Sequence, residues 1–99
     1  MRAYLAALAT STQDFVKVTE ENAETGDTFS LSMCGKIYYY GYETEVNKEK
    51  AADFFKKASD QGDVDSIAYY ASMLENGDGV EADEEFACEY YKKAADLGD

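Results

Sequence analysis

The pattern closest to a chemical site in this chain is a short glycine-rich loop. Gly77-Asp78-Gly79 has the composition of a calcium-binding loop. Val80 follows where such a loop needs an oxygen ligand, and no glycine stands at its sixth place. We therefore expect no metal ion there.

Catalytic side chains are equally scarce. The 99 residues include no His, which removes both the commonest general base and the commonest metal ligand. No Ser has an evident Lys partner that could activate it as a nucleophile. The sequence predicts a protein that is not an enzyme and that needs no cofactor.

The net charge of −12 comes from 21 acidic and 9 basic residues, and it argues against nucleic acid and anionic membranes as partners. Residues 58–91 contain ten acidic side chains and no Lys or Arg. These acids either form a solvated face or attract basic partners, and both interpretations stay open. No apolar run approaches the roughly 18 residues that a membrane span requires.

A repeat of 36 residues organises the chain. Residues 27–62 align without a gap on residues 63–98, and 11 positions are identical. A fixed period of this size indicates a solenoid of stacked units. Each copy contains two helical patterns joined by a short turn, which predicts an antiparallel helix-turn-helix hairpin. The fold class is therefore an all-α solenoid.

Helix ends can be placed from capping residues. Asp27, Asn47, Asp63 and Asp83 stand before the periodic segments as N-caps, and Gly26, Gly62 and Gly98 stand as stops. The expected helices cover about 28–40, 48–60, 64–76 and 84–96. Gly35 lies inside the first of them, where we expect a neighbouring helix to press backbone against backbone.

Residues 1–26 form a degenerate leading repeat, followed by the repeats 27–62 and 63–99, and the three parts make one solenoid domain. Thr12 is a plausible cap for a helix over Gln13–Glu24. Residues 1–9 resemble the start of a signal peptide. The alternative is an apolar helix that covers the first repeat, and on that basis we expect a cytoplasmic protein.

The second copy carries the motif Gly77-x-Gly79-Val80-x-x-Asp83-x-x-x-Ala87-x-x-Tyr90-Tyr91-x-Lys93-Ala94-Ala95-x-x-Gly98. This motif resembles the Sel-one-like repeat (SLR), a relative of the tetratricopeptide repeat. The first copy departs from it, with Glu43-Thr44 in place of Gly79-Val80. The resemblance implies a right-handed superhelix that acts as an adaptor and assembles proteins on its concave surface.

If the first helix of each hairpin lines the concave side, the face opposite the core is the candidate binding surface. Tyr39, Tyr40 and Lys36 are its best contact candidates, because Tyr is enriched at binding surfaces. Packing of both tyrosines against the neighbouring hairpin is the competing interpretation. The predicted partner-binding residues are Phe29, Ser32, Lys36, Tyr39, Tyr40, Asp65, Ser72, Glu75 and Asn76, and Ala68 lies on the same face.

Two function classes follow from these patterns. The first is a non-catalytic scaffold that binds a partner peptide or helix, with a basic partner favoured by the acidic charge. The second is a secreted protein of the cysteine-rich, penicillin-binding branch of the family, which would pair Cys34 with Cys88. We expect instead that both cysteines are small buried side chains. Apolar side chains on the last helix also suggest a longer array or self-association.

Overall fold

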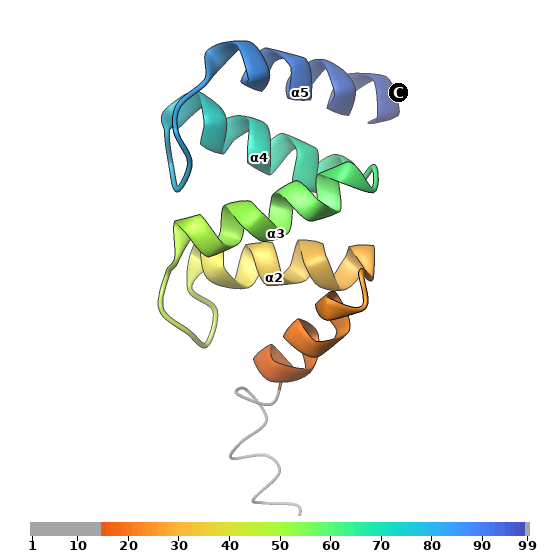
Figure 1. The fold of residues 1–99 in the computed structure, drawn as a ribbon, viewed down its shortest axis with the longest axis vertical. Helices are drawn as coiled ribbons and strands as arrows, with labels where there is room; N and C mark the ends of the chain where they lie inside the picture. The colour runs from red at the N-terminus through yellow and green to blue at the C-terminus, as the bar shows by residue number, and fades with distance from the viewer. Residues whose placement is uncertain (1–14, 99) are drawn as a thin grey trace, which may run out of the picture.

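The computed structural model describes residues 15–98, which form helices joined by tight turns (Figure 1). Residues 15–24 are helical, and they are followed by α2 (Thr28–Tyr40), α3 (Lys48–Asp60), α4 (Val64–Asn76) and α5 (Glu84–Gly98). The bounds predicted for α2, α3 and α4 are confirmed. The cap at Thr12 and the segment 1–9 lie outside the described residues. No helix within residues 15–98 has the length and apolar character needed to cross a bilayer.

The last helix ends at Gly98, but without the left-handed backbone that stops the other helices. Gly26 and Gly62 adopt φ angles of 86° and 89°, the left-handed conformation that turns the chain out of a helix. Gly98 does not adopt a positive φ, and it is the last residue of α5 as the structure describes it. Glycines at equivalent positions of the repeat therefore differ in backbone conformation.

The helix N-termini are capped as the sequence predicts. Asp27 and Asp63 each accept a 3.0 Å hydrogen bond from the backbone N–H of the serine three residues later. The Ser30 hydroxyl also donates to the Asp27 carboxylate at 2.8 Å, and this bond, together with the backbone bond, lowers the pKa of Asp27 below its usual value. Side chains of Asn47 and Asp83 accept equivalent bonds at α3 and α5. Local capping thus fixes where each helix begins.

The helices stack as two antiparallel hairpins, α2–α3 and α4–α5, in an elongated solenoid of 55 × 25 × 20 Å (Figure 1). Besides the packing within each hairpin, α3 packs on α4 and α2 also contacts α4. Among these labelled helices, no Cα atom of α3 lies within 8 Å of one in α5. In a curved stack the helices on the inner side approach one another, so α2 and α4 line the inner, concave face.

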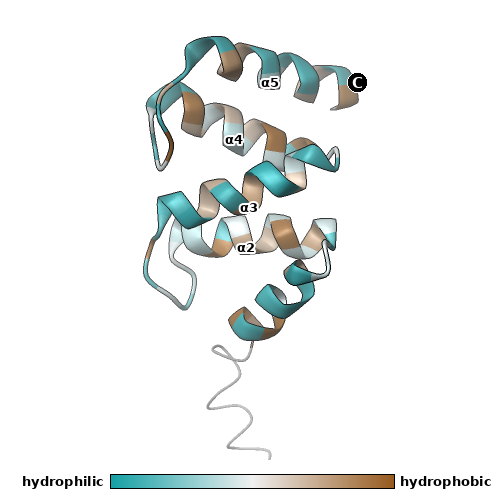
Figure 2. Ribbon diagram, viewed as in Figure 1, coloured by the Kyte–Doolittle hydropathy of each residue, from teal (hydrophilic) through white to brown (hydrophobic). Residues whose placement is uncertain are grey.

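The core lies between successive helices, where the hydrophobic segments of the ribbon turn toward their neighbours (Figure 2). Phe55 of α3 is fully buried and packs with Ile37 of α2 and Met73 of α4. A Cβ atom at Gly35 would lie only 2.6 Å from the Phe55 ring. The expected backbone-to-backbone contact at Gly35 is therefore wrong, because an aromatic ring of the same hairpin fills that space.

The two hairpin turns keep one backbone shape with different residues. Glu43 in the first turn has φ 57°, and its repeat equivalent Gly79 has φ 80°. The second turn needs glycine for a further reason, since a Cβ at Gly79 would lie 2.4 Å from the carbonyl oxygen of Lys48. The loss of glycine from the first turn therefore costs backbone strain but does not change the fold.

A polar contact ties the leading helix to the first hairpin. The hydroxyl of buried Tyr38 donates a hydrogen bond to the Glu20 carboxylate. The Lys50 ammonium lies 3.7 Å from that carboxylate and 4.4 Å from the centre of the Tyr38 ring. Three successive helices therefore meet at this one tyrosine.

Candidate interaction surface

An open groove of about 280 Å³ lies on the concave face, where α2 meets α4. Tyr39 contributes one wall from α2. The other wall comes from α4 and consists of Asp65, Ala68, Tyr69 and Ser72. Every lining residue except Tyr69 lies on the face predicted from the sequence, and Tyr39, Asp65 and Ser72 are predicted site residues. The structure thus brings residues from both repeats into one concavity.

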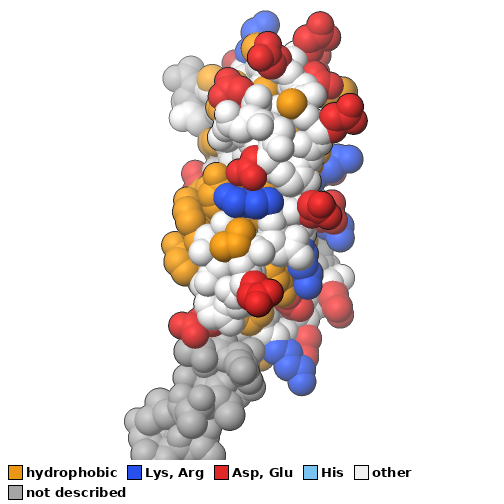
Figure 3. Space-filling model, turned by 90° about the vertical axis from the view of Figure 1, so that its left-hand side faces the viewer, with side chains coloured by type: hydrophobic (Ala, Val, Ile, Leu, Met, Phe, Trp, Pro, Cys, Tyr) orange, Lys and Arg blue, Asp and Glu red, His pale blue; other side chains and the backbone are white. Residues whose placement is uncertain are grey.

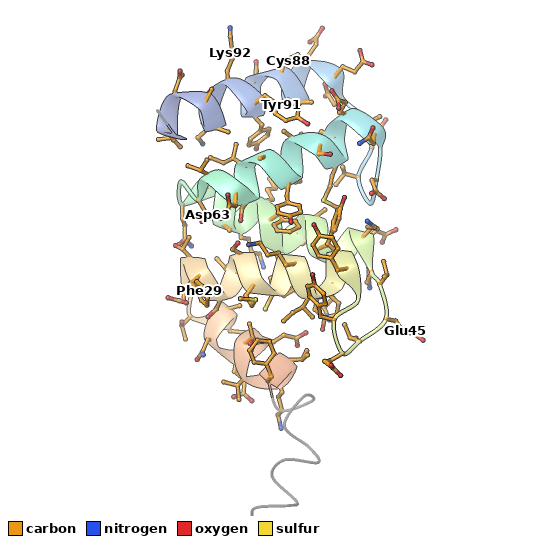
Figure 4. The ribbon with its side chains drawn as sticks, turned by 180° about the vertical axis from the view of Figure 1, so that it is seen from behind. Phe29, Glu45, Asp63, Cys88, Tyr91 and Lys92 are labelled. Atoms are coloured by element: carbon orange, nitrogen blue, oxygen red, sulfur yellow. The ribbon has the colours of Figure 1, made fainter. Side chains whose placement is uncertain are left out.

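Tyrosine rings from the two hairpins interlock beside this groove. The Tyr39 ring lies edge-on to Tyr40 at 4.9 Å and to Tyr69 at 5.4 Å. Tyr69 stacks in parallel on the buried Phe55 ring, with centroids 4.6 Å apart. In Figure 4, aromatic rings gather between α2 and α4. Offset and edge-on ring contacts of this kind hold the side chains in fixed positions.

A pair of tyrosine hydroxyls joins the two repeats beside the groove. The Tyr40 and Tyr69 oxygens are 2.6 Å apart, so one hydroxyl donates to the other. This hydrogen bond, together with burial, raises the pKa of Tyr69 to about 12. The Tyr69 hydroxyl therefore stays protonated at neutral pH and adds no negative charge to the groove.

Packing of Tyr39 and Tyr40 against the neighbouring hairpin is confirmed, and their contact with a partner stays a prediction. Tyr39 is half-buried because it packs on Tyr69 of the neighbouring hairpin. Tyr40 keeps 47% of its surface exposed, although its hydroxyl is bound. Hydrophobic side chains also gather on the outside at mid-height of the stack, on the side where the turns lie (Figure 3). The tyrosine cluster is thus partly core and partly surface.

A lysine already lies against the tyrosine cluster. The Lys48 ammonium is 3.4 Å from the centre of the Tyr39 ring, and it also lies 3.4 Å from an Asp78 carboxylate oxygen. The contact connects the N-terminus of α3 with the turn after α4. One face of Tyr39 is therefore occupied by a cation from the same chain.

The other predicted site residues do not line the groove. Phe29 is 72% exposed and lies at the end of α2 opposite the turn that holds Glu45 (Figure 4). Ser32 is only 7% exposed, which leaves little surface for a partner. Lys36 is half-buried, whereas Glu75 and Asn76 are exposed on α4. The groove is thus narrower than the stripe expected from helical periodicity.

Tyr69 lines the groove but is not among the residues predicted from the sequence. It follows Ala68 directly and corresponds to the half-buried Met33 in the first repeat. Its position lies between the core face and the concave face of α4, so periodicity assigned it to neither. A tyrosine at a boundary position is itself the signal, because its ring can pack while its hydroxyl reaches the surface.

The two cysteines differ in a way that the sequence did not predict. Cys34 is buried beside Leu31 and Ala58, and burial raises the pKa of its thiol to about 11. The expectation that Cys88 is also buried is wrong, since it is exposed on the outer side of α5 (Figure 4). No described helix packs on Cys88, whereas α4 packs on the equivalent Ala52. Both cysteines are unpaired in the structure.

Helices stacked in this way, with a shared concave face, define an all-α helical-repeat solenoid. The family model for the Sel1 repeat matches residues 29–63 and again residues 64–99. The chain therefore belongs to the Sel1 repeat family. Repeats of this family are generally non-catalytic modules for protein–protein interaction.

Three solved structures resemble the chain closely. A protective antigen of uropathogenic Escherichia coli with an SLR fold matches at TM-score 0.84 and 28% identity, over 89% of this chain and 19% of the antigen. A Sel1 repeat protein of Oxalobacter formigenes matches at TM-score 0.80 and 26% identity, over 84% of this chain and 63% of that protein. Cysteine rich protein B of Helicobacter pylori matches at TM-score 0.82 and 24% identity, over 88% of this chain and 65% of that protein.

The chain thus spans less than two thirds of the length of each of these proteins. The Helicobacter pylori likeness concerns the fold, and its cysteine-rich character has no counterpart in the unpaired Cys34 and Cys88. No curated protein sequence is significantly similar to the chain.

Proposed function

We propose that this chain is a non-catalytic interaction module that binds a partner peptide or helix in the concave groove between α2 and α4. The observation that carries the proposal is the joint lining of this groove by Tyr39 from one repeat and Tyr69 from the next. Membership of the Sel1 repeat family supports a role in protein interaction.

The chemistry of the groove suits a protein partner. Tyrosine rings provide rigid apolar area at small conformational cost, and such side chains dominate binding energy at many interfaces. The Ser72 hydroxyl and the Asp65 carboxylate add polar groups at its edge. The core beneath is already packed, since Tyr69 stacks on Phe55. The wall is therefore preorganised, which lowers the entropic cost of binding.

Selection of binders from a library of short random peptides tests this function. We compare the wild-type chain with Ala68→Trp, which fills the groove and removes none of the tyrosines. Ala95→Trp is the matched control, because Ala95 is exposed on α5, away from the groove. Ala68→Trp should weaken the selected peptides by about tenfold or more, as expected where a central contact is blocked.

Calorimetry gives the affinities, and circular dichroism establishes that both variants keep their helices. Unchanged affinity in Ala68→Trp, or equal losses in the two variants, would contradict binding in the groove. A selection that yields no specific peptide would contradict the proposed function altogether.

A further inference from the structure

The α4 side of the groove carries acidic residues, and binding of a peptide does not by itself explain them. Asp65 is exposed, it is the charged residue of the lining, and it forms no ion pair within residues 15–98. The helix that carries it contains a second acid, Glu75, and no Lys or Arg. Lys36 of α2 is the base on the predicted concave stripe. The α4 wall therefore presents negative charge to whatever enters.

This negative charge extends well beyond the groove. Residues 58–91 hold ten acidic side chains and no base, within a chain of net charge −12. The field of such a surface attracts cationic segments and repels anionic ones. A basic occupant is thus favoured over an acidic one before any contact is made.

The chain's own Lys48 shows how this environment holds a cation. Its ammonium lies over the Tyr39 ring and next to Asp78, a ring face combined with a carboxylate. The groove offers the same pair of groups a second time, with Tyr69 and Asp65 on its α4 wall. Cation–π attraction and an ion pair act together on one head group in such an arrangement.

We propose that the occupant of the groove is a basic peptide segment, with a Lys or Arg side chain bound between the tyrosine rings and Asp65. The aliphatic stem of that side chain lies over Ala68, and its charged head reaches the Asp65 carboxylate. The inference rests on the proposed function, because it names the partner class of the same groove.

The peptide selection described above provides the probe, and its binders are sequenced for Lys and Arg content. Each basic binder is also synthesised with its Lys replaced by norleucine, or its Arg by citrulline, which removes charge and keeps size. These neutral peptides should bind about tenfold more weakly, since they lose a cation–π contact and an ion pair.

Asp65→Asn is the matching change in the protein. It should weaken basic peptides about twofold to fivefold, as expected for an exposed ion pair, and leave the neutral peptides unaffected. Glu84→Gln is the control, because Glu84 also lies in the first turn of a helix but outside the groove. Raised salt should weaken the basic peptides in the same direction.

Different results would overturn the basic occupant and the groove as the binding site. Binders that Ala68→Trp blocks, but that lack Lys and Arg or are indifferent to Asp65→Asn, would overturn the basic occupant and leave the groove as the site. The absence of any peptide sensitive to Ala68→Trp would overturn both.

Discussion

The second helices of the two hairpins, α3 and α5, have similar sequences but different surroundings. Ala51 and its equivalent Ala87 are both buried, because the first helix of the same hairpin covers them. On the next face the helices diverge: Ala52, Phe55 and Ser59 of α3 are buried, whereas Cys88, Tyr91 and Ala95 of α5 are exposed. Phe55 and Ala52 share one cluster with Met73 of α4. The neighbouring hairpin therefore completes the burial of this face.

The cysteines test this difference most directly. Iodoacetamide should alkylate exposed Cys88 at least about 100-fold faster than Cys34, since the reagent needs an accessible thiolate. Burial raises the pKa of Cys34 to about 11, so its thiol stays protonated at neutral pH and becomes reactive only as the pH approaches that value. Mass spectrometry of the folded chain over time measures both rates. Similar rates would mean that the α2–α3 core opens freely.

Substitution of the equivalent aromatic residues Phe55 and Tyr91 should give the next largest difference, in the free energy of unfolding. Phe55→Ala should lower the free energy of unfolding by about 3–5 kcal/mol, because it opens a cavity in the core. Tyr91→Ala at the same place in the repeat should change it by no more than about 0.5 kcal/mol, as expected for a surface substitution. Urea denaturation followed by circular dichroism measures both values.

Equal losses of unfolding free energy in Phe55→Ala and Tyr91→Ala would contradict the difference in burial between the two positions. They would mean that the Tyr91 face is covered in solution, as self-association through α5 would do. Sedimentation at increasing concentration detects such a complex.

The two hairpin turns provide the smallest of these contrasts. Gly79→Ala should destabilise the chain by about 1–3 kcal/mol, because it adds strain at positive φ and a clash with the Lys48 carbonyl. Glu43→Gly should stabilise it by up to about 1 kcal/mol, since glycine adopts the left-handed conformation without strain.

Gly62→Ala separates the two causes in that contrast. Its φ of 89° is similar to that of Gly79, but nothing lies within 4 Å of an added Cβ. The same denaturation measurement should therefore show a smaller loss than for Gly79→Ala. A loss as large as that of Gly79→Ala would assign the whole effect to backbone conformation.

Most residues that line the groove could be predicted from the sequence, and Tyr69 is the exception. Tyr39, Asp65 and Ser72 share a face of their helices that spacing alone identifies. Tyr69 could not be assigned, because its ring packs on Phe55 while its hydroxyl reaches Tyr40 in another repeat. Periodicity describes one helix at a time and does not show which face of a neighbour it meets.

The sequence by itself determined the helices and the repeat. Caps such as Asp27 and Asp63 act on backbone groups three residues away, and the 36-residue period fixes the hairpin, so both can be read locally. Tertiary structure alone decided that Cys88 is exposed and that the Phe55 ring fills the space at Gly35. These features depend on contacts between helices, and a repeated sequence cannot encode a difference that its surroundings impose.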